Sequence, residues 1–156
     1  MGAGPNRDGI NGHRVHMGNT MNVPIEAIEA SYPIRIVAYQ LIPDSGGRGK
    51  FRGGCGVRRV YEALESGVRF SVLCERSLYP AWGLLGGRPG RNAYFYIEDP
   101  QGARTPLPSK VASMELPKGC RLYIETAGGG GYGPPEERDS MLSQRDLLEG
   151  YVTKDG

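Results

Sequence analysis

The sequence is short of cysteine and has no long apolar run. Its three cysteines, Cys55, Cys74 and Cys120, are far apart and form no Cys-x-x-Cys pair, which argues against a disulfide framework and for a reducing compartment. No apolar stretch reaches the roughly 18 residues that a membrane-spanning helix needs. The first residues also lack the apolar core of a secretory signal. We therefore expect a cytoplasmic protein that makes no membrane contact.

A strong excess of charge of one sign is also lacking. The net charge is only +2, which gives no support to nucleic acid as a partner. The charges are nevertheless unevenly placed, because residues 44–60 are mainly basic and residues 125–149 mainly acidic. These two stretches can pair with each other or with neighbouring subunits, and solvated faces are the simplest interpretation.

Glycine and proline, in contrast, are abundant. The 156 residues include 25 glycines and 12 prolines, and fifteen of the glycines fall in the windows 46–56, 83–90 and 128–133. The absence of a strict three-residue glycine period excludes collagen. So much glycine leaves few side chains for a core. We expect a single domain, 1–156, that either depends on a partner or packs backbone against backbone.

Short segments of strand-forming residues recur along the middle of the chain. The candidate strands are 34–42, 57–63, 68–75, 93–98, 104–107, 111–116 and 121–126. Glycine turns predict hairpins between 57–63 and 68–75 and between 111–116 and 121–126, and 104–107 is expected to pair back on 93–98. A short helix is predicted to begin at Pro24, and a longer one over 135–149 carries a stripe formed by Met141, Leu142, Arg145 and Leu147 or Leu148.

The predicted fold is mainly β, with two sheets in a barrel-like or sandwich arrangement. Gly/Pro-rich extended segments of polyproline II type and one C-terminal helix complete it. Within the single domain we expect an extended arm with a short helix at 1–33, a β body at 34–126, and a glycine-rich segment with the C-terminal helix at 127–156.

The glycine windows allow two interpretations. Glycine-rich loops can cradle a phosphate, and the window 128–133 precedes a helix. The window lacks the Lys-Ser/Thr ending of a P-loop, however, and Pro134 and Pro135 remove two N–H donors where a phosphate would need them. We therefore favour extended segments that pack closely because side chains are absent, with tight turns accounting for the remainder.

Two other groups of residues are candidates for chemistry. His13 and His16 are spaced to hold a metal only on a helix, and no carboxylate or cysteine follows at ligand spacing, so a structural histidine or a contact with substrate or a neighbouring subunit is favoured. The second group is aromatic and consists of Tyr79, Trp82, Tyr94, Phe95 and Tyr96. Aromatic residues near arginines can stack on bases, but strand aromatics more often belong to a core or an interface.

Much of the chain resembles the hydantoinase B family, in the C-terminal region of its B-type chains. The matching stretches, in order, are Arg7–Gly12, His16–Glu26, Tyr39–Leu41, Pro43–Gly47, Gly49, Phe51–Gly54, Gly56, Glu75–Arg76, Pro80, Trp82–Leu84, Gly86–Gly90, Leu107–Lys110, Glu125–Thr126, Gly128–Pro134, Asp146 and Glu149–Val152. The chain begins at a Met, whereas typical B-type chains are several times longer, so we expect an independent small subunit. A piece of an ordinary B-type chain is the alternative.

The resemblance implies a function in ATP-dependent chemistry. In this family a separate hydantoinase A-type, kinase-like chain binds ATP with Mg²⁺, and the B-type chain takes part in the later hydrolytic or carboxylating step. The leading expectation is a small non-ATP-binding subunit of a ketone carboxylase such as acetophenone carboxylase, which converts acetophenone and bicarbonate to benzoylacetate. Its partners would be A-type chains and a truncated B-type chain. The alternatives are part of a cyclic-amide hydrolase and a purely structural adaptor.

The resemblance assigns few residues. The family's metal ligands belong to the earlier part of the B-type chain, so no cofactor is expected on this chain, and a divalent metal is expected only on the larger partner. His16 and Asn19 match the motif His-Met-Gly-Asn-Thr and are the candidate catalytic residues. Arg14 stands two positions before His16, where family members often have histidine, and this weakens a role for paired histidines.

Overall fold

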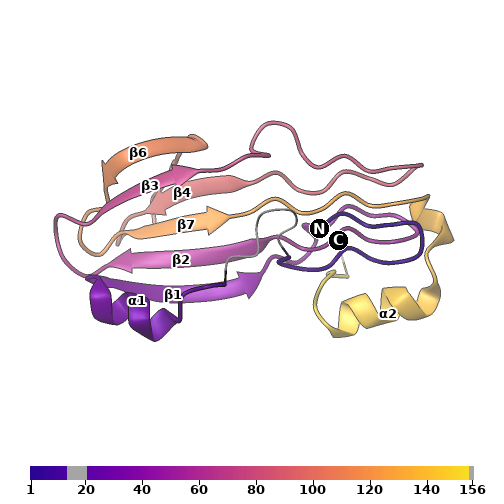
Figure 1. Ribbon diagram of the computed structural model, residues 1–156, viewed down its shortest axis with the longest axis horizontal. Helices are drawn as coiled ribbons and strands as arrows, with labels where there is room; N and C mark the ends of the chain where they lie inside the picture. The colour runs from indigo at the N-terminus through magenta and orange to yellow at the C-terminus, as the bar shows by residue number, and fades with distance from the viewer. Residues whose placement is uncertain (14–20, 155–156) are drawn as a thin grey trace.

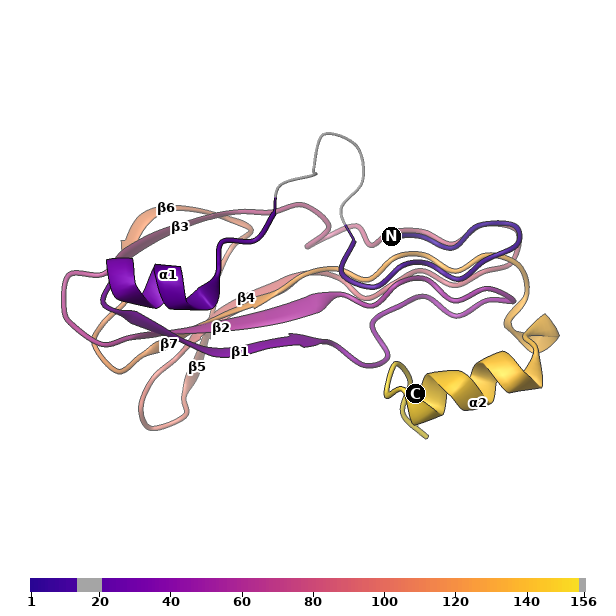
Figure 2. The ribbon, with the colours of Figure 1, turned by 60° about the horizontal axis from the view of Figure 1, so that its bottom comes forward.

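The computed structural model describes residues 1–13 and 21–154, and most of its regular structure is β. In chain order the elements are α1 (Ile25–Ser31), β1 (Ile34–Leu41), β2 (Val57–Ala63), β3 (Arg69–Leu73), β4 (Tyr94–Glu98), β5 (Arg104–Pro106), β6 (Lys110–Glu115), β7 (Arg121–Glu125), a 3₁₀ turn η1 (Pro135–Glu137) and α2 (Ser140–Leu148). Strands lie in one half of the molecule, and extended segments fill the other (Figures 1 and 2). No helix in the described residues is long and apolar enough to cross a membrane.

The strands form two antiparallel sheets. One has five strands in the order β1-β2-β7-β4-β5, and β3 and β6 form the other. Alternate residues of β4 and β7 face the small sheet, so that Phe95 and Leu122 are buried with Val72 and Leu116 in the apolar core between the layers. The predicted two-sheet β fold is confirmed in its sandwich form, because neither sheet closes into a barrel within the described residues.

Two of the predicted hairpins are wrong. Strand β2 pairs with β1 and β7 instead of β3, and β6 pairs with β3 instead of β7. The turns around Gly67 and Gly119 carry the chain from one layer to the other, because the five-stranded sheet must bury one face under a second layer. The pairing of β4 with β5 agrees with the prediction. The predicted helix 135–149 is divided into η1 and α2.

Four glycine-rich segments lie side by side beyond the end of the large sheet (Figure 2). We call these segments, 1–12, 42–56, 80–91 and 127–133, the glycine bundle. Its central segment is 128–131, whose four glycines are buried. Gly129 donates to the carbonyl of Gly54 at 2.9 Å and accepts from the N–H of Gly47 at 2.8 Å. Further hydrogen bonds join the central segment to 1–12 and to both arms of 80–91.

The central segment leaves no room for side chains. A Cβ added to Gly128 or Gly131 would point at the backbone of 45–48, one on Gly129 at Met1, and one on Gly130 at Trp82, each closer than 3.0 Å. The direction of the added Cβ thus returns after three residues, from Gly128 to Gly131. Polyproline II conformation, which has three residues per turn, stays a prediction for this segment. The bundle takes segments from all three parts into which the sequence divides.

One buried carboxylate lies where the sheet continues into the bundle. The side chain of Glu125, at the end of β7, is only 3% exposed and contacts two arginines. Its Oε1 atom lies 2.7 Å from Nε of Arg58 on β2, and its Oε2 atom lies 2.6 Å from the guanidinium of Arg91 in the bundle. A carboxylate that is buried in this way is stabilised by charge-assisted hydrogen bonds, which here join the two halves of the molecule.

The thiols provide a simple test of the packing. Cys55 and Cys120 are buried, Cys74 is half-buried, and burial raises the pKa of all three thiols. The reagent must reach a thiolate, and only Cys74 is partly exposed. We therefore expect Cys74 to react first with Ellman's reagent at neutral pH and the other two thiols to react only as the protein unfolds. Cys74→Ser should remove the early phase. Rapid release of three equivalents of thionitrobenzoate by the folded protein would show that all three thiols are accessible and would contradict this packing.

Candidate functional site

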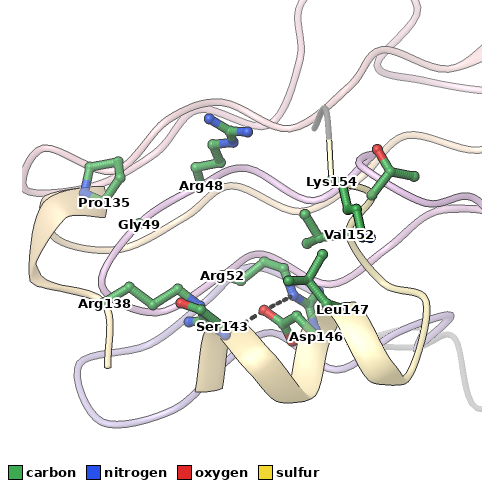
Figure 3. A pocket seen from close by; sticks show the side chains of 11 residues that line it. Arg48, Gly49, Arg52, Pro135, Arg138, Ser143, Asp146, Leu147, Val152 and Lys154 are labelled. Atoms are coloured by element: carbon green, nitrogen blue, oxygen red, sulfur yellow. Dashed lines mark hydrogen bonds and ion pairs between the residues drawn. The ribbon is translucent and has the colours of Figure 1, made fainter. Parts of the chain in front are cut away.

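A pocket of about 420 Å³ lies between α2 and the glycine bundle (Figure 3). Helix α2 begins after Asp139, whose side chain accepts a hydrogen bond from the N–H of Met141 at 2.7 Å, as expected of an N-cap. The only buried residue of the helix is Asp146, whereas Met141 and Leu148 are 77% and 88% exposed. The buried contact of the helix with the bundle is therefore a charged one, and Met141 and Leu148 of its apolar stripe face solvent, whereas Leu142 is half-buried.

A chain of four charged side chains lies at this pocket, and three of them, Arg52, Arg138 and Asp146, line it. Asp146 Oδ2 lies 3.2 Å from Arg52 Nε and 2.6 Å from the guanidinium of Arg138, and Figure 3 shows both contacts meeting at this carboxylate. The Arg138 guanidinium also forms a bidentate ion pair with Asp8, with its two terminal nitrogens 2.8 and 2.9 Å from the two carboxylate oxygens. The network joins two segments of the bundle, 1–12 and 42–56, to α2 and to Arg138, which precedes it. The basic stretch 44–60 and the acidic stretch 125–149 thus pair with each other, and solvated faces are the wrong interpretation for these residues.

The network is suited to architecture more than to catalysis. Arg52 and Asp146 have side chains only 5% and 2% exposed, and the Arg52 guanidinium also donates to the carbonyl of Gly53 and lies over the ring of Tyr151. The second oxygen of Asp146, Oδ1, is buried and has no hydrogen-bond partner among the described residues. At the pocket rim, Arg48 and Lys154 add positive charge that favours an anionic group.

Asp8 makes the stability of this network depend on pH. Burial opposes the ionisation of Asp8, but hydrogen bonds from Arg138 and from the N–H of Arg52 outweigh it and lower the pKa of its carboxyl. This stabilisation is present above about pH 4, the ordinary pKa of aspartate, and is lost as the pH falls through the lower folded value. We expect the wild type to exceed Asp8→Asn by about 2 kcal/mol in free energy of unfolding at pH 6. Urea titrations should show this difference in free energy of unfolding decrease towards pH 3. A difference that stayed constant with pH would exclude a stabilising role for the ionised Asp8 carboxylate.

A second pocket, of about 740 Å³, lies over β1 and β2 of the large sheet. Asn22 donates to the hydroxyl of Tyr39 at 2.9 Å, and the guanidinium of Arg59 lies 4.3 Å from the centre of the Tyr39 ring. Arg59 is the main cause that lowers the pKa of the Tyr39 phenol. The pocket therefore offers a fixed positive charge and two hydrogen-bonding side chains, which suits a polar or anionic small molecule.

The structure does not place the predicted catalytic residues. His16 and Asn19 lie outside the described residues, so their positions are not assigned. The residues on either side of that segment, His13 and Met21-Asn22, line the pocket. Among the described residues, no group of three or more His, Cys, Asp or Glu side chains is placed to hold a metal ion.

Sequence reasoning missed the Arg52–Asp146 pair and the Tyr39–Arg59 pair as sites. The sequence around each of these residues contains no site motif. Only the fold brings Arg52 into contact with Asp146, 94 positions away. A signal was present for Tyr39, Arg52 and Asp146, which all belong to the stretches that carry the family resemblance.

Comparison with known proteins places the chain in a family. The family model described as hydantoinase B/oxoprolinase matches residues 1–135. The chain belongs to the hydantoinase B/oxoprolinase family. Members with similar sequences include an uncharacterized protein of Methanocaldococcus jannaschii (43% identity over 85% of this chain), a 5-oxoprolinase of Dictyostelium discoideum (34% over 91%) and the caprolactamase subunit beta of Pseudomonas jessenii (33% over 89%).

Two solved structures share the fold of this chain. The ATP-dependent caprolactamase of Pseudomonas jessenii matches 99% of the chain with a TM-score of 0.80 and 26% identity. An acetone carboxylase matches 96% with a TM-score of 0.70 and 21% identity, which shows the fold alone. The chain spans only part of the length of these relatives: 23% of the Methanocaldococcus jannaschii protein, 24% of the caprolactamase subunit beta and 11% of the 5-oxoprolinase.

Proposed function

We propose that this chain is a non-ATP-binding component of an ATP-dependent enzyme that opens cyclic amides. The observation that carries the proposal is the extent of the similarity to the caprolactamase. It covers 89% of the chain in sequence and 99% in structure, with a TM-score of 0.80. The 5-oxoprolinase similarity, over 91% of the chain, supports the same class of reaction. In this proposal the pocket beside Tyr39 and Arg59 faces the substrate, with His16 and Asn19 as the proposed contacts.

ATP and Mg²⁺ are proposed to bind to hydantoinase A-type subunits. The glycine-rich segment 128–133 gives its N–H groups to carbonyls of the chain itself: Gly128 donates to Arg91, Gly129 to Gly54 and Gly131 to Arg88. These donors are therefore already used and do not form a phosphate cradle. Any divalent metal of the reaction is proposed to belong to a larger B-type partner chain.

A ketone carboxylase is the second candidate, as the sequence resemblance first suggested. The shared fold with acetone carboxylase is compatible with an acetophenone carboxylase subunit, although at 21% identity it carries no information on substrate. A purely structural adaptor is the third candidate, and the thin core and glycine bundle favour it.

Reconstitution would distinguish these functions. The chain is combined with the A-type and large B-type chains of the same genome, and ADP release is measured with caprolactam, hydantoin or 5-oxoproline, and separately with acetone or acetophenone plus bicarbonate. We expect ring-opened product coupled to ADP release, and no turnover when this chain is omitted. Carboxylated ketone would select the second candidate. If His16→Ala, Asn19→Ala and Arg59→Met complexes all turned over normally, the proposed substrate contacts would be wrong and the adaptor would be favoured.

A further inference from the structure

An apolar strip projects from the glycine bundle between β3 and β4. Its five large side chains are between 51% and 81% exposed, and we call them the apolar ridge: Leu78, Tyr79, Trp82, Leu84 and Leu85. They belong to the trace that leaves β3 and forms the upper edge of the bundle in Figure 1. A run of exposed large apolar residues of this kind marks an interaction surface.

The backbone at Leu85 indicates that the ridge is not there for the fold. Leu85 has a φ of 48°, followed by Gly86 at 92°, in a tight turn closed by the N–H of Gly87 and the carbonyl of Leu84 at 2.9 Å. Glycine or asparagine adopts this left-handed conformation at lower cost than leucine. Leucine here is both strained and 73% exposed, so neither turn formation nor core packing explains it.

The ridge is also held in place before any partner binds. The N–H of Leu84 donates to the carbonyl of Gly131 at 2.9 Å, and the N–H of Arg88 donates to the carbonyl of Arg48 at 2.6 Å, so both arms of the segment are anchored to the rest of the bundle. The Arg76 guanidinium lies 5.2 Å from the centre of the Trp82 ring. A surface fixed in this way loses little conformational entropy on association.

We propose that the apolar ridge binds the large B-type chain, the polypeptide equivalent to the part of the relatives that this chain does not contain. This inference rests on the proposed function. The relatives carry about three quarters or more of their length outside the matched region, since the matches span 11% to 24% of them. The ridge lies inside the family match 1–135, whereas the exposed apolar residues of α2 lie outside it.

The charges beside the ridge define the chemistry of the partner surface. Arg76 and Arg88 lie on either side of it in sequence, are exposed, and form no ion pair with any described residue. The complementary surface is therefore an apolar groove with acidic side chains at its rim.

The test uses the large B-type chain of the same genome as the probe, with affinity measured by biolayer interferometry and stoichiometry by native mass spectrometry. Leu85→Asn should weaken binding at least about tenfold and leave the melting temperature of this chain unchanged or higher, because asparagine tolerates the turn conformation. Trp82→Ser should weaken it about 30-fold. Leu148→Asn is the matched control, a leucine outside the ridge that is 88% exposed against 73% for Leu85, and should leave the affinity unchanged.

The outcomes separate this inference from the proposed function. If the wild type forms a fixed-stoichiometry complex that the two ridge variants do not weaken, the ridge assignment is wrong and the subunit function stands. If the wild type forms no complex with the B-type chain, both are overturned. A homodimer of this chain that Leu85→Asn dissociates would assign the ridge to a second copy instead.

Discussion

Replacing Gly129 by alanine is expected to abolish the folded state. Gly129 is buried at the centre of the glycine bundle, and a Cβ there would meet the backbone carbonyl of Met1 and the N–H of Gly2, both closer than 3.0 Å. The Met1 carbonyl accepts a hydrogen bond from the N–H of Gly54 at 2.9 Å, and backbone atoms have no rotamer by which to yield. We expect the free energy of unfolding to fall by at least about 4 kcal/mol. This is an exceptional value for the addition of one methyl group, and it is comparable to the whole stability of many domains. Urea unfolding followed by circular dichroism measures it.

Two other glycines provide graded controls. At Gly2 the nearest atom to an added Cβ is 3.6 Å away, so Gly2→Ala should be nearly neutral. At Gly67 nothing lies within 4 Å but φ is 84°, so Gly67→Ala should cost about 1 kcal/mol through the backbone alone. If Gly129→Ala unfolded at the same urea concentration as Gly2→Ala, the close packing of the bundle would be refuted.

The glycine windows show what a sequence can and cannot predict about such a bundle. Their density predicts close backbone contact, because only glycine lets two chains approach so nearly. It does not predict which segments meet, because glycine carries no side chain whose alternation or charge identifies a partner. That 128–131 is surrounded by 1–12, 42–56 and 80–91 therefore becomes visible only in the structure.

The strands illustrate the same limit at the level of pairing. Alternating apolar residues located all seven strands to within a few positions. The turn at Gly67 reads as a hairpin, yet a glycine turn serves equally well to carry the chain to another layer. The choice depends on which face of the large sheet must be covered, and that is decided by Phe95, Leu122 and their neighbours, far along the chain.

The charged pairs at the two pockets depend on long-range contacts, and sequence reasoning did not predict them. The sequence offered His16 and Asn19 from the family motif, whereas the described geometry shows paired charges that no local pattern displays. Helix α2 is the sharpest case, because its apolar stripe suggests a buried face of leucines. The structure instead buries a carboxylate, Asp146, in contact with Arg52 and Arg138.

We expect Asp146→Ala to detach α2 and to destabilise the whole chain by about 3–5 kcal/mol. Arg52 is only 5% exposed at its side chain, and without Asp146 its buried guanidinium keeps contacts to the Gly53 carbonyl and the Tyr151 ring but loses its ion pair. Removing one partner of a buried pair costs more than the pair contributes, because the remaining charge stays desolvated. Thermal unfolding and protease cleavage of 134–154 both report the change.

Two comparisons distinguish a buried-charge effect from simple loss of helix contacts. Glu149→Ala breaks an exposed pair on the same helix, Arg145–Glu149 at 3.7 Å, and should cost no more than about 0.5 kcal/mol. Adding Arg52→Met to Asp146→Ala should recover part of the lost stability, because the unpaired buried charge is then absent and a side chain of similar length fills the space. If the double variant were less stable than Asp146→Ala by the full cost of Arg52→Met alone, the two residues would act independently. Helix α2 would then be held by contacts other than this ion pair.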